Sequence, residues 1–220
     1  MSDERQSGFR DAEQDIRTAS DIPDTPQTRA PAYRLAFADE DFLLRDELRP
    51  VRLQLELLKP EMMMAEKGIE IPTEQVDIMG GENRQDGHLA RNPMGQLPCL
   101  ELDDGSFLSE ITAIGEYLEE LHPEPPMIGT TPEERLRVHE LERICEIGVL
   151  LNVAIMVQNT SPFFSRHIQQ TEEGANNGRR RAMGTVRVLD SKIGDSAFVA
   201  GDKPTIADCT LFAAIGFSSM

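Results

Sequence analysis

The residues with the clearest chemical potential lie between Gln96 and Ile111, in the sequence QLPCLELDDGSFLSEI. Pro98 cannot donate a hydrogen bond to a sheet, so it belongs at an edge, a bulge or a cis turn. A cis Leu97-Pro98 bond would turn the backbone of Leu97 outward, where an extended peptide could pair with it. Glu110 directly precedes an expected helix, and a helix N-terminus suits anionic groups. The pattern suits the binding of a small peptide that carries carboxylates.

Two of these residues also have a purely structural interpretation. Pro98 fits the edge of an ordinary hairpin that packs on a helix. Glu110 fits a carboxylate that the helix dipole stabilises. On the residues alone, both interpretations stay open.

The elements that must position these residues follow from hydrophobic spacing. Residues 96–102 and 106–109 read as short strands joined by the turn Asp103-Asp104-Gly105, and a helix is indicated from Thr112. Upstream, residues 51–58 alternate apolar and polar side chains and predict the first strand. A helix should follow from Pro60 to Gly68, and a second strand within residues 69–78. The order β-α-β-α-β-β-α is that of a thioredoxin-like α/β domain.

The second half of the chain predicts an all-α domain. Residues 123–129 form a proline-rich linker, and long helical periodicities cover residues 132–157 and 169–193. Thr131 is the expected N-cap of the first of these helices. Thr205 and Asp208 approximate a capping box ahead of a last apolar helix.

Taken in order, these segments resemble the glutathione S-transferase family. The resemblance rests on residues Asn92 to Pro98, Leu100 to Gly105, Ser109-Glu110, Ala113-Ile114, Tyr117-Leu118 and Ala65 to Ile69. It implies an α/β thioredoxin-like domain at 49–122, a linker at 123–129 and an all-α helical domain at 130–220. Residues 1–48 would be a disordered or unmatched extension, with a short amphipathic helix over 33–48.

The resemblance implies a glutathione site. The backbone of Leu97, before a cis Pro98, would pair with the cysteinyl unit, and Gln96 would hold the glycyl end. Glu110 would receive the γ-glutamyl ammonium, and the Ile111 N–H would meet a carboxylate. Glutathione would be the co-substrate, a small electrophile the acceptor, and the chain a homodimer.

The residue that would activate the thiol is missing from its expected place. In this family a Tyr, Ser or Cys lies between the first strand and the first helix, here expected near residues 57–60. No Ser, Thr, Tyr or Cys occurs from Arg34 to Met64. The catalytic residue is therefore unassigned. A non-catalytic glutathione-binding protein and an inactive fragment remain as alternatives. The end at Met220, where family members continue, predicts a truncated form with an exposed apolar patch.

Composition narrows the classes of partner. The net charge of −17 argues against nucleic acid and against an anionic membrane surface. Cys99, Cys145 and Cys209 form no CxxC pair and read as core thiols, which fits the reducing cytoplasm. The four histidines lack the spacing of metal ligands, so we expect no metal site.

Overall fold

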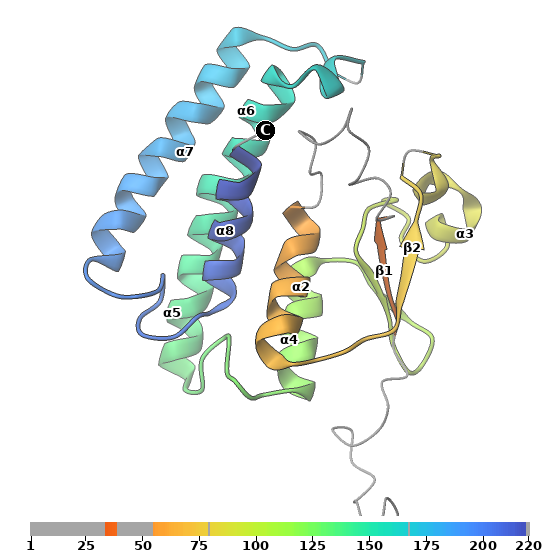
Figure 1. Cartoon of the computed structure of the whole chain (residues 1–220), viewed down its shortest axis with the longest axis horizontal. Helices are drawn as coiled ribbons and strands as arrows, with labels where there is room; N and C mark the ends of the chain where they lie inside the picture. The colour runs from red at the N-terminus through yellow and green to blue at the C-terminus, as the bar shows by residue number, and fades with distance from the viewer. Residues whose placement is uncertain (1–33, 39–54, 79, 167, 219–220) are drawn as a thin grey trace, which may run out of the picture. The chain divides into compact units, whose positions relative to one another are not determined.

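The computed structural model describes residues 34–38, 55–78, 80–166 and 168–218 (Figure 1). Four strands form one sheet in the order β2-β1-β3-β4. They are β1 (Arg34–Ala38), β2 (Thr73–Val76), β3 (Cys99–Glu101) and β4 (Phe107–Leu108). β1 runs parallel to β2 and antiparallel to β3, and β3 and β4 form an antiparallel hairpin. The hairpin lies where the turn at Asp103-Asp104-Gly105 predicts it.

The first strand lies upstream of its predicted position. Residues 55–58, predicted as part of a strand, begin helix α2 (Leu55–Lys67), and residues 51–54 are outside the described residues. Leu55, Leu58 and Met62 are three and four residues apart, so the same leucines also fit a helical period. The strand of the sheet is β1, in a segment predicted as a helix. The predicted domain limit at residue 49 is therefore too late, since β1 belongs to the same sheet.

Two helices pack together beside the sheet. They are α2 and α4 (Ile111–Leu121), and a 3₁₀ turn η2 (Glu82–Arg84) and the short helix α3 (Asp86–Leu89) connect β2 to β3. Gly68 ends α2 with a φ of 64°, a left-handed conformation that glycine adopts without strain. Met63, Leu100, Ile114 and Leu118 are at most 1% exposed and form the core of this half.

Five helical segments form the second half of the chain. They are α5 (Pro132–Arg143), a π-helical segment η3 (Ile144–Leu150), α6 (Leu151–Thr160), α7 (Glu172–Ile193) and α8 (Ile206–Ser218). A 3₁₀ turn η4 (Pro162–Arg166) connects α6 toward α7. Thr131 and Glu134 form the capping box of α5, which confirms Thr131 as its N-cap. The predicted helix over 132–157 is thus continuous but contains a π segment.

The two halves share one core. In Figure 1, α2 and α4 lie between the sheet and α8, and α2 packs against α8. Met63 from α2 and Ile206 and Cys209 from α8 belong to the same buried cluster. This contact brings the start of α4 close to η3 and α6. The candidate site lies between them. No helix in the described part of the chain is long and apolar enough to cross a membrane.

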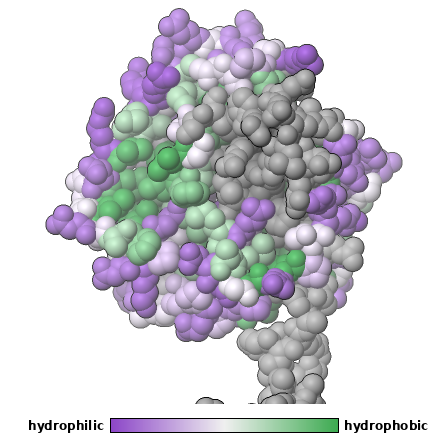
Figure 2. Space-filling view, viewed as in Figure 1, coloured by the Kyte–Doolittle hydropathy of each residue, from purple (hydrophilic) through white to green (hydrophobic). Residues whose placement is uncertain are grey.

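An apolar groove lies on another face of the helical half. Figure 2 shows apolar side chains gathered where α7 and α8 run. Met183, Val186, Leu211 and Ile215 line this groove, and Met183 and Ile215 are 48% and 58% exposed.

Candidate functional site

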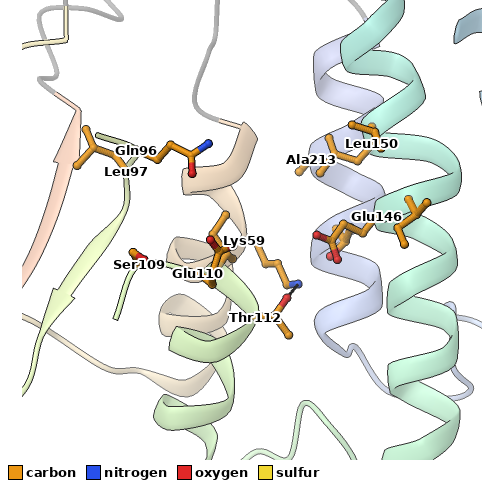
Figure 3. Close-up of a pocket in the computed structure, with 13 residues that line it drawn as sticks. Lys59, Gln96, Leu97, Ser109, Glu110, Thr112, Glu146, Leu150 and Ala213 are labelled. Carbon is orange, nitrogen blue, oxygen red and sulfur yellow. Dashed lines mark hydrogen bonds between the residues drawn. The ribbon is translucent and has the colours of Figure 1, made fainter. Parts of the chain in front are cut away.

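A pocket lies between the start of α4 and the helical half of the chain (Figure 3). It holds about 820 Å³ of empty space, including open solvent at its mouth. Its wall on the α/β side consists of Lys59, Gln96, Leu97, Ser109, Glu110, Ile111 and Thr112. The wall on the helical side consists of Glu146, Ile147, Leu150 and Leu151 from η3 and α6, with Thr210 and Ala213 from α8. The size and the mixed lining suit a small molecule with both polar and apolar parts.

Four of the five predicted binding residues line this pocket. Gln96 and Leu97 approach from the segment before β3, and Glu110 and Ile111 from the start of α4. The Leu97-Pro98 bond is cis, as predicted. Pro98 is not among the lining residues, and it follows Leu97 directly. The structure therefore brings the predicted residues to one surface, with Pro98 behind it.

Two buried polar side chains fix the segment that carries Gln96 and Leu97. The Gln96 carbonyl accepts hydrogen bonds from Asn92 Nδ2 at 2.9 Å and from His88 Nε2 at 3.0 Å. Asn92 is 1% exposed and His88 5%. Because a carbonyl only accepts, His88 must carry its proton on Nε2. Sequence analysis did not assign either residue; the Asn-Pro pair at 92 and 93 was the available signal.

Glu110 is free to meet a ligand. It is the N-cap residue of α4, yet its side chain makes no capping hydrogen bond. Its carboxylate is exposed and lines the pocket. Beside it, Ile111 and Thr112 belong to the first turn of α4, where backbone N–H groups lack partners within the helix. The start of α4 thus offers both a carboxylate and unpaired amides to the pocket.

Lys59 is the cation of the pocket, and sequence analysis did not identify it. Its ammonium forms an ion pair with Glu142, which is 0% exposed, and donates to Thr112 Oγ1 at 3.5 Å (Figure 3). Lys59 and Glu142 lie 83 residues apart, on α2 and α5. No local sequence pattern links residues at that distance, so only the fold reveals the pair.

Comparisons with known proteins identify the family. The family models for the N-terminal and the C-terminal domain of glutathione S-transferases match residues 58–121 and 153–220. A maleylacetoacetate isomerase from Pseudomonas aeruginosa is 32% identical over 152 residues, which are 67% of this chain and 69% of that protein. The chain belongs to the glutathione S-transferase family. A glutathione-dependent activity follows from this membership.

Further relatives agree with this family. Glutathione S-transferase 2 of Saccharomyces cerevisiae is 28% identical over 173 residues, covering 78% of this chain and 72% of that protein. The crystal structure of a glutathione S-transferase domain-containing protein from Marinobacter aquaeolei is 27% identical, with a TM-score of 0.71. It covers 84% of this chain and 86% of that one. The predicted fold class, a thioredoxin-like domain followed by an all-α domain, is confirmed.

The segment that carries the thiol-activating residue in glutathione S-transferases lies elsewhere than predicted. Residues 57–60 are part of α2, and the connection from β1 to α2 spans residues 39–54, outside the described residues. Its sequence, DEDFLLRDELRPVRLQ, contains no Ser, Thr, Tyr or Cys. The absence of the usual hydroxyl or thiol therefore persists when the strand is correctly placed.

The three cysteines do not supply the missing group. All three are free and buried. Burial raises the pKa of Cys145 to about 12 and that of Cys209 to about 11, and it also raises the pKa of Cys99. A thiol with such a pKa stays protonated and is a poor nucleophile. The prediction that they are core residues is confirmed by their burial.

Proposed function

We propose that this glutathione S-transferase binds glutathione in the pocket and transfers its thiolate to an electrophilic small molecule. The observation that carries the proposal is the meeting of Gln96, Leu97 and Glu110 at one pocket that the helical half closes. The thiolate attacks the electrophile, and the new carbon–sulfur bond joins the two substrates.

Each part of glutathione has a matching group in the pocket. The γ-glutamyl ammonium pairs with the Glu110 carboxylate, which makes a charge-assisted hydrogen bond. The cysteinyl unit pairs with the backbone of Leu97, and the glycyl end lies near Gln96. The Ile111 N–H, in the first turn of α4, faces a carboxylate. This arrangement points the thiol toward the helical wall of the pocket.

The electrophile then lies against the helical wall. Ile147, Leu150 and Leu151 supply an apolar surface there, and Ile147 and Leu151 are 50% and 54% exposed. Covering such side chains with an apolar ring removes their surface from water and favours binding. We therefore propose an apolar or aromatic acceptor.

A binding protein without catalysis is the second candidate. It is favoured by the lack of any Ser, Thr, Tyr or Cys in residues 39–54. Turnover of a generic aryl halide, or of maleylacetoacetate in view of the isomerase relative, separates the two candidates. A homodimer and a cytoplasmic location are part of the proposal; the three buried free thiols fit a reducing compartment.

Calorimetric titration of glutathione tests the site. Glu110→Ala should weaken binding by roughly 1–3 kcal/mol, the value of a hydrogen bond to a charged group. Glu133→Ala is the matched control, because Glu133 also lies in the first turn of a helix but outside this pocket. The control should bind like the parent chain. Equal affinity of all three proteins would refute the assigned role of Glu110.

A further inference from the structure

Lys59 is the one cation among the described residues that line the pocket. Two carboxylates share this lining, Glu110 and Glu146. Glu146 already pairs with Arg143 at 2.6 Å, and Glu110 faces the ammonium of glutathione in the proposed function. Among the described residues that line the pocket, an anion therefore has one positive group to meet, the Lys59 ammonium.

The ammonium of Lys59 has an N–H group for which the described part of the chain provides no acceptor. A lysine ammonium carries three N–H groups. In the described part of the chain, its acceptors are a Glu142 oxygen and, at the long distance of 3.5 Å, Thr112 Oγ1. One N–H therefore remains for a ligand, and the weak bond to Thr112 can be exchanged for a better one.

The ion pair is oriented with its positive end toward the pocket. Lys59 lines the pocket, whereas Glu142 is 0% exposed and does not. Figure 3 shows the Lys59 side chain extending from α2 past the start of α4, toward the helical wall. Glu142 on α5 holds the ammonium in a fixed place at the pocket, so its N–H groups do not have to reorient to meet an anion.

Lys59 already acts on thiols in this part of the molecule. Burial and the Glu142 carboxylate raise the pKa of Cys145, and the charge of Lys59 opposes this rise. The same opposition acts at Cys209 on α8. The anion of a thiol bound in the pocket would be stabilised by the same positive charge.

We propose that the Lys59 ammonium stabilises the glutathione thiolate, in place of the hydroxyl or thiol that residues 34–64 lack. This inference rests on the proposed function. The S–H bond breaks with its electron pair staying on sulfur, and the proton passes to solvent water. The sulfur then accepts an N–H hydrogen bond from the Lys59 ammonium and attacks the electrophilic carbon. With an aryl halide as the acceptor, the carbon–halogen bond breaks and the halide leaves with its electron pair. No further co-reactant is needed.

The other polar and titratable groups around Lys59 also affect the pKa of a thiol bound in the pocket. The titratable or polar groups on the elements packed around it are Glu110 and Thr112 on α4, Glu142 on α5, Cys145 and Glu146 on η3, and Asp208, Cys209 and Thr210 on α8. The three carboxylates other than Glu142 all disfavour a thiolate. The positive charge of Lys59 must therefore lower the pKa of the bound thiol by more than these three carboxylates raise it.

The test measures the pKa of the thiol of bound glutathione, from the ultraviolet absorbance of the thiolate at saturating protein. The variant Lys59→Met/Glu142→Gln removes both charges and avoids an uncompensated buried one. We expect the pKa of the bound thiol to rise by about one unit or more, so that the thiolate fraction falls roughly tenfold below that pKa. The affinity for the protonated form of glutathione should stay unchanged.

Two further variants make the result specific. Lys67→Met/Glu119→Gln removes another buried Lys–Glu pair, at 2.6 Å, that does not line the pocket, and it should leave the thiol pKa unchanged. Glu142→Gln alone leaves Lys59 unneutralised and should lower the pKa of the bound thiol. A merely structural role would not move the pKa in opposite directions in the two Glu142 variants.

Three results would overturn the proposal. An unchanged thiol pKa in both Glu142 variants removes Lys59 from the chemistry. A loss of affinity with an unchanged thiol pKa assigns Lys59 to a carboxylate of glutathione instead. Failure of the parent chain to bind glutathione refutes the proposed function itself, and this inference with it.

Discussion

Asp208 should be among the most costly polar residues to replace, although it does not line the candidate pocket. Its Oδ1 accepts the Val199 N–H at 2.8 Å, and its Oδ2 accepts the Thr205 N–H and hydroxyl at 2.8 Å each. Val199 and Thr205 are both 7% exposed. The carboxylate therefore ties the loop before α8 to the first turn of that helix.

The size of the effect follows from these three bonds. Asp208→Ala leaves two backbone N–H groups without an acceptor, and the Thr205 hydroxyl can rotate to another. An unsatisfied buried donor costs about 1–3 kcal/mol, so the free energy of unfolding should fall by roughly 3–5 kcal/mol. That is a large share of the 5–15 kcal/mol typical of a folded domain. Asp208→Asn keeps one acceptor and should fall between the variant and the parent.

Urea unfolding followed by circular dichroism measures the effect. The urea midpoint should drop while the slope of the transition stays the same. Asp195→Ala is the control, because Asp195 is exposed, and it should lie within about 0.5 kcal/mol of the parent. A loss below about 1 kcal/mol for Asp208→Ala, with the slope unchanged, would show that the three hydrogen bonds are replaced by water and refute the reasoning.

Three further predictions concern packing, thiols and pH. Gly178→Ala should destabilise the chain by about 1–3 kcal/mol, because its Cβ would lie 2.6 Å from the Asn152 carbonyl oxygen. Gly184→Ala, with open space around it, should instead stabilise by roughly 0.5–1 kcal/mol; thermal unfolding of both tests this, and equal effects would contradict it. The three buried thiols should resist Ellman's reagent until the chain unfolds, and prompt reaction of the folded chain would show them exposed. Hydrogen bonds from Thr130 lower the pKa of Glu134, so its contribution to stability is present above its usual pKa and disappears as the pH falls through the lowered value. Glu134→Gln should therefore flatten the acid side of the stability curve, and an unchanged curve would contradict this.

The parts of the fold that sequence predicts well are those with strong local signals. The hairpin at Asp103-Asp104-Gly105 and helix α4 follow from turn chemistry and spacing within about thirty residues, so they are found where expected. The α5 capping box is a local signal of the same kind. The first strand lies elsewhere than predicted because residues 51–58 alternate as in a strand, whereas Leu55, Leu58 and Met62 fit a helical period. Such a short run cannot decide between the two without the sheet that it would join.

The residues of the candidate site also differ in whether a local sequence pattern predicts them. Gln96, Leu97 and Glu110 lie in one continuous stretch of sequence. Their residue types and spacing there are sufficient to predict them as binding residues. His88 acts through a hydrogen bond to the Gln96 carbonyl, and Lys59 through an ion pair across the two halves of the chain. The ion pair depends on the packing of α2 against the helical half, which no spacing in the sequence encodes. The hydrogen bond of His88 spans only eight residues, but it depends on the path of the loop between α3 and β3.

The π-helical segment shows how the helical wall of the pocket acquires its shape. In η3 the Leu151 N–H donates to the Glu146 carbonyl, five residues back, and Asn152 Nδ2 donates to the carbonyls of Ile147 and Gly148 at 2.9 and 3.1 Å. The amide of Asn152 thus satisfies carbonyls that the wide turn leaves without their usual partners. Glu146, Ile147 and Leu150, which line the pocket, all lie in this segment. A regular α-helix would rotate each of these side chains relative to its neighbours, so the wall that faces the electrophile depends on Asn152, a residue that does not line the pocket itself.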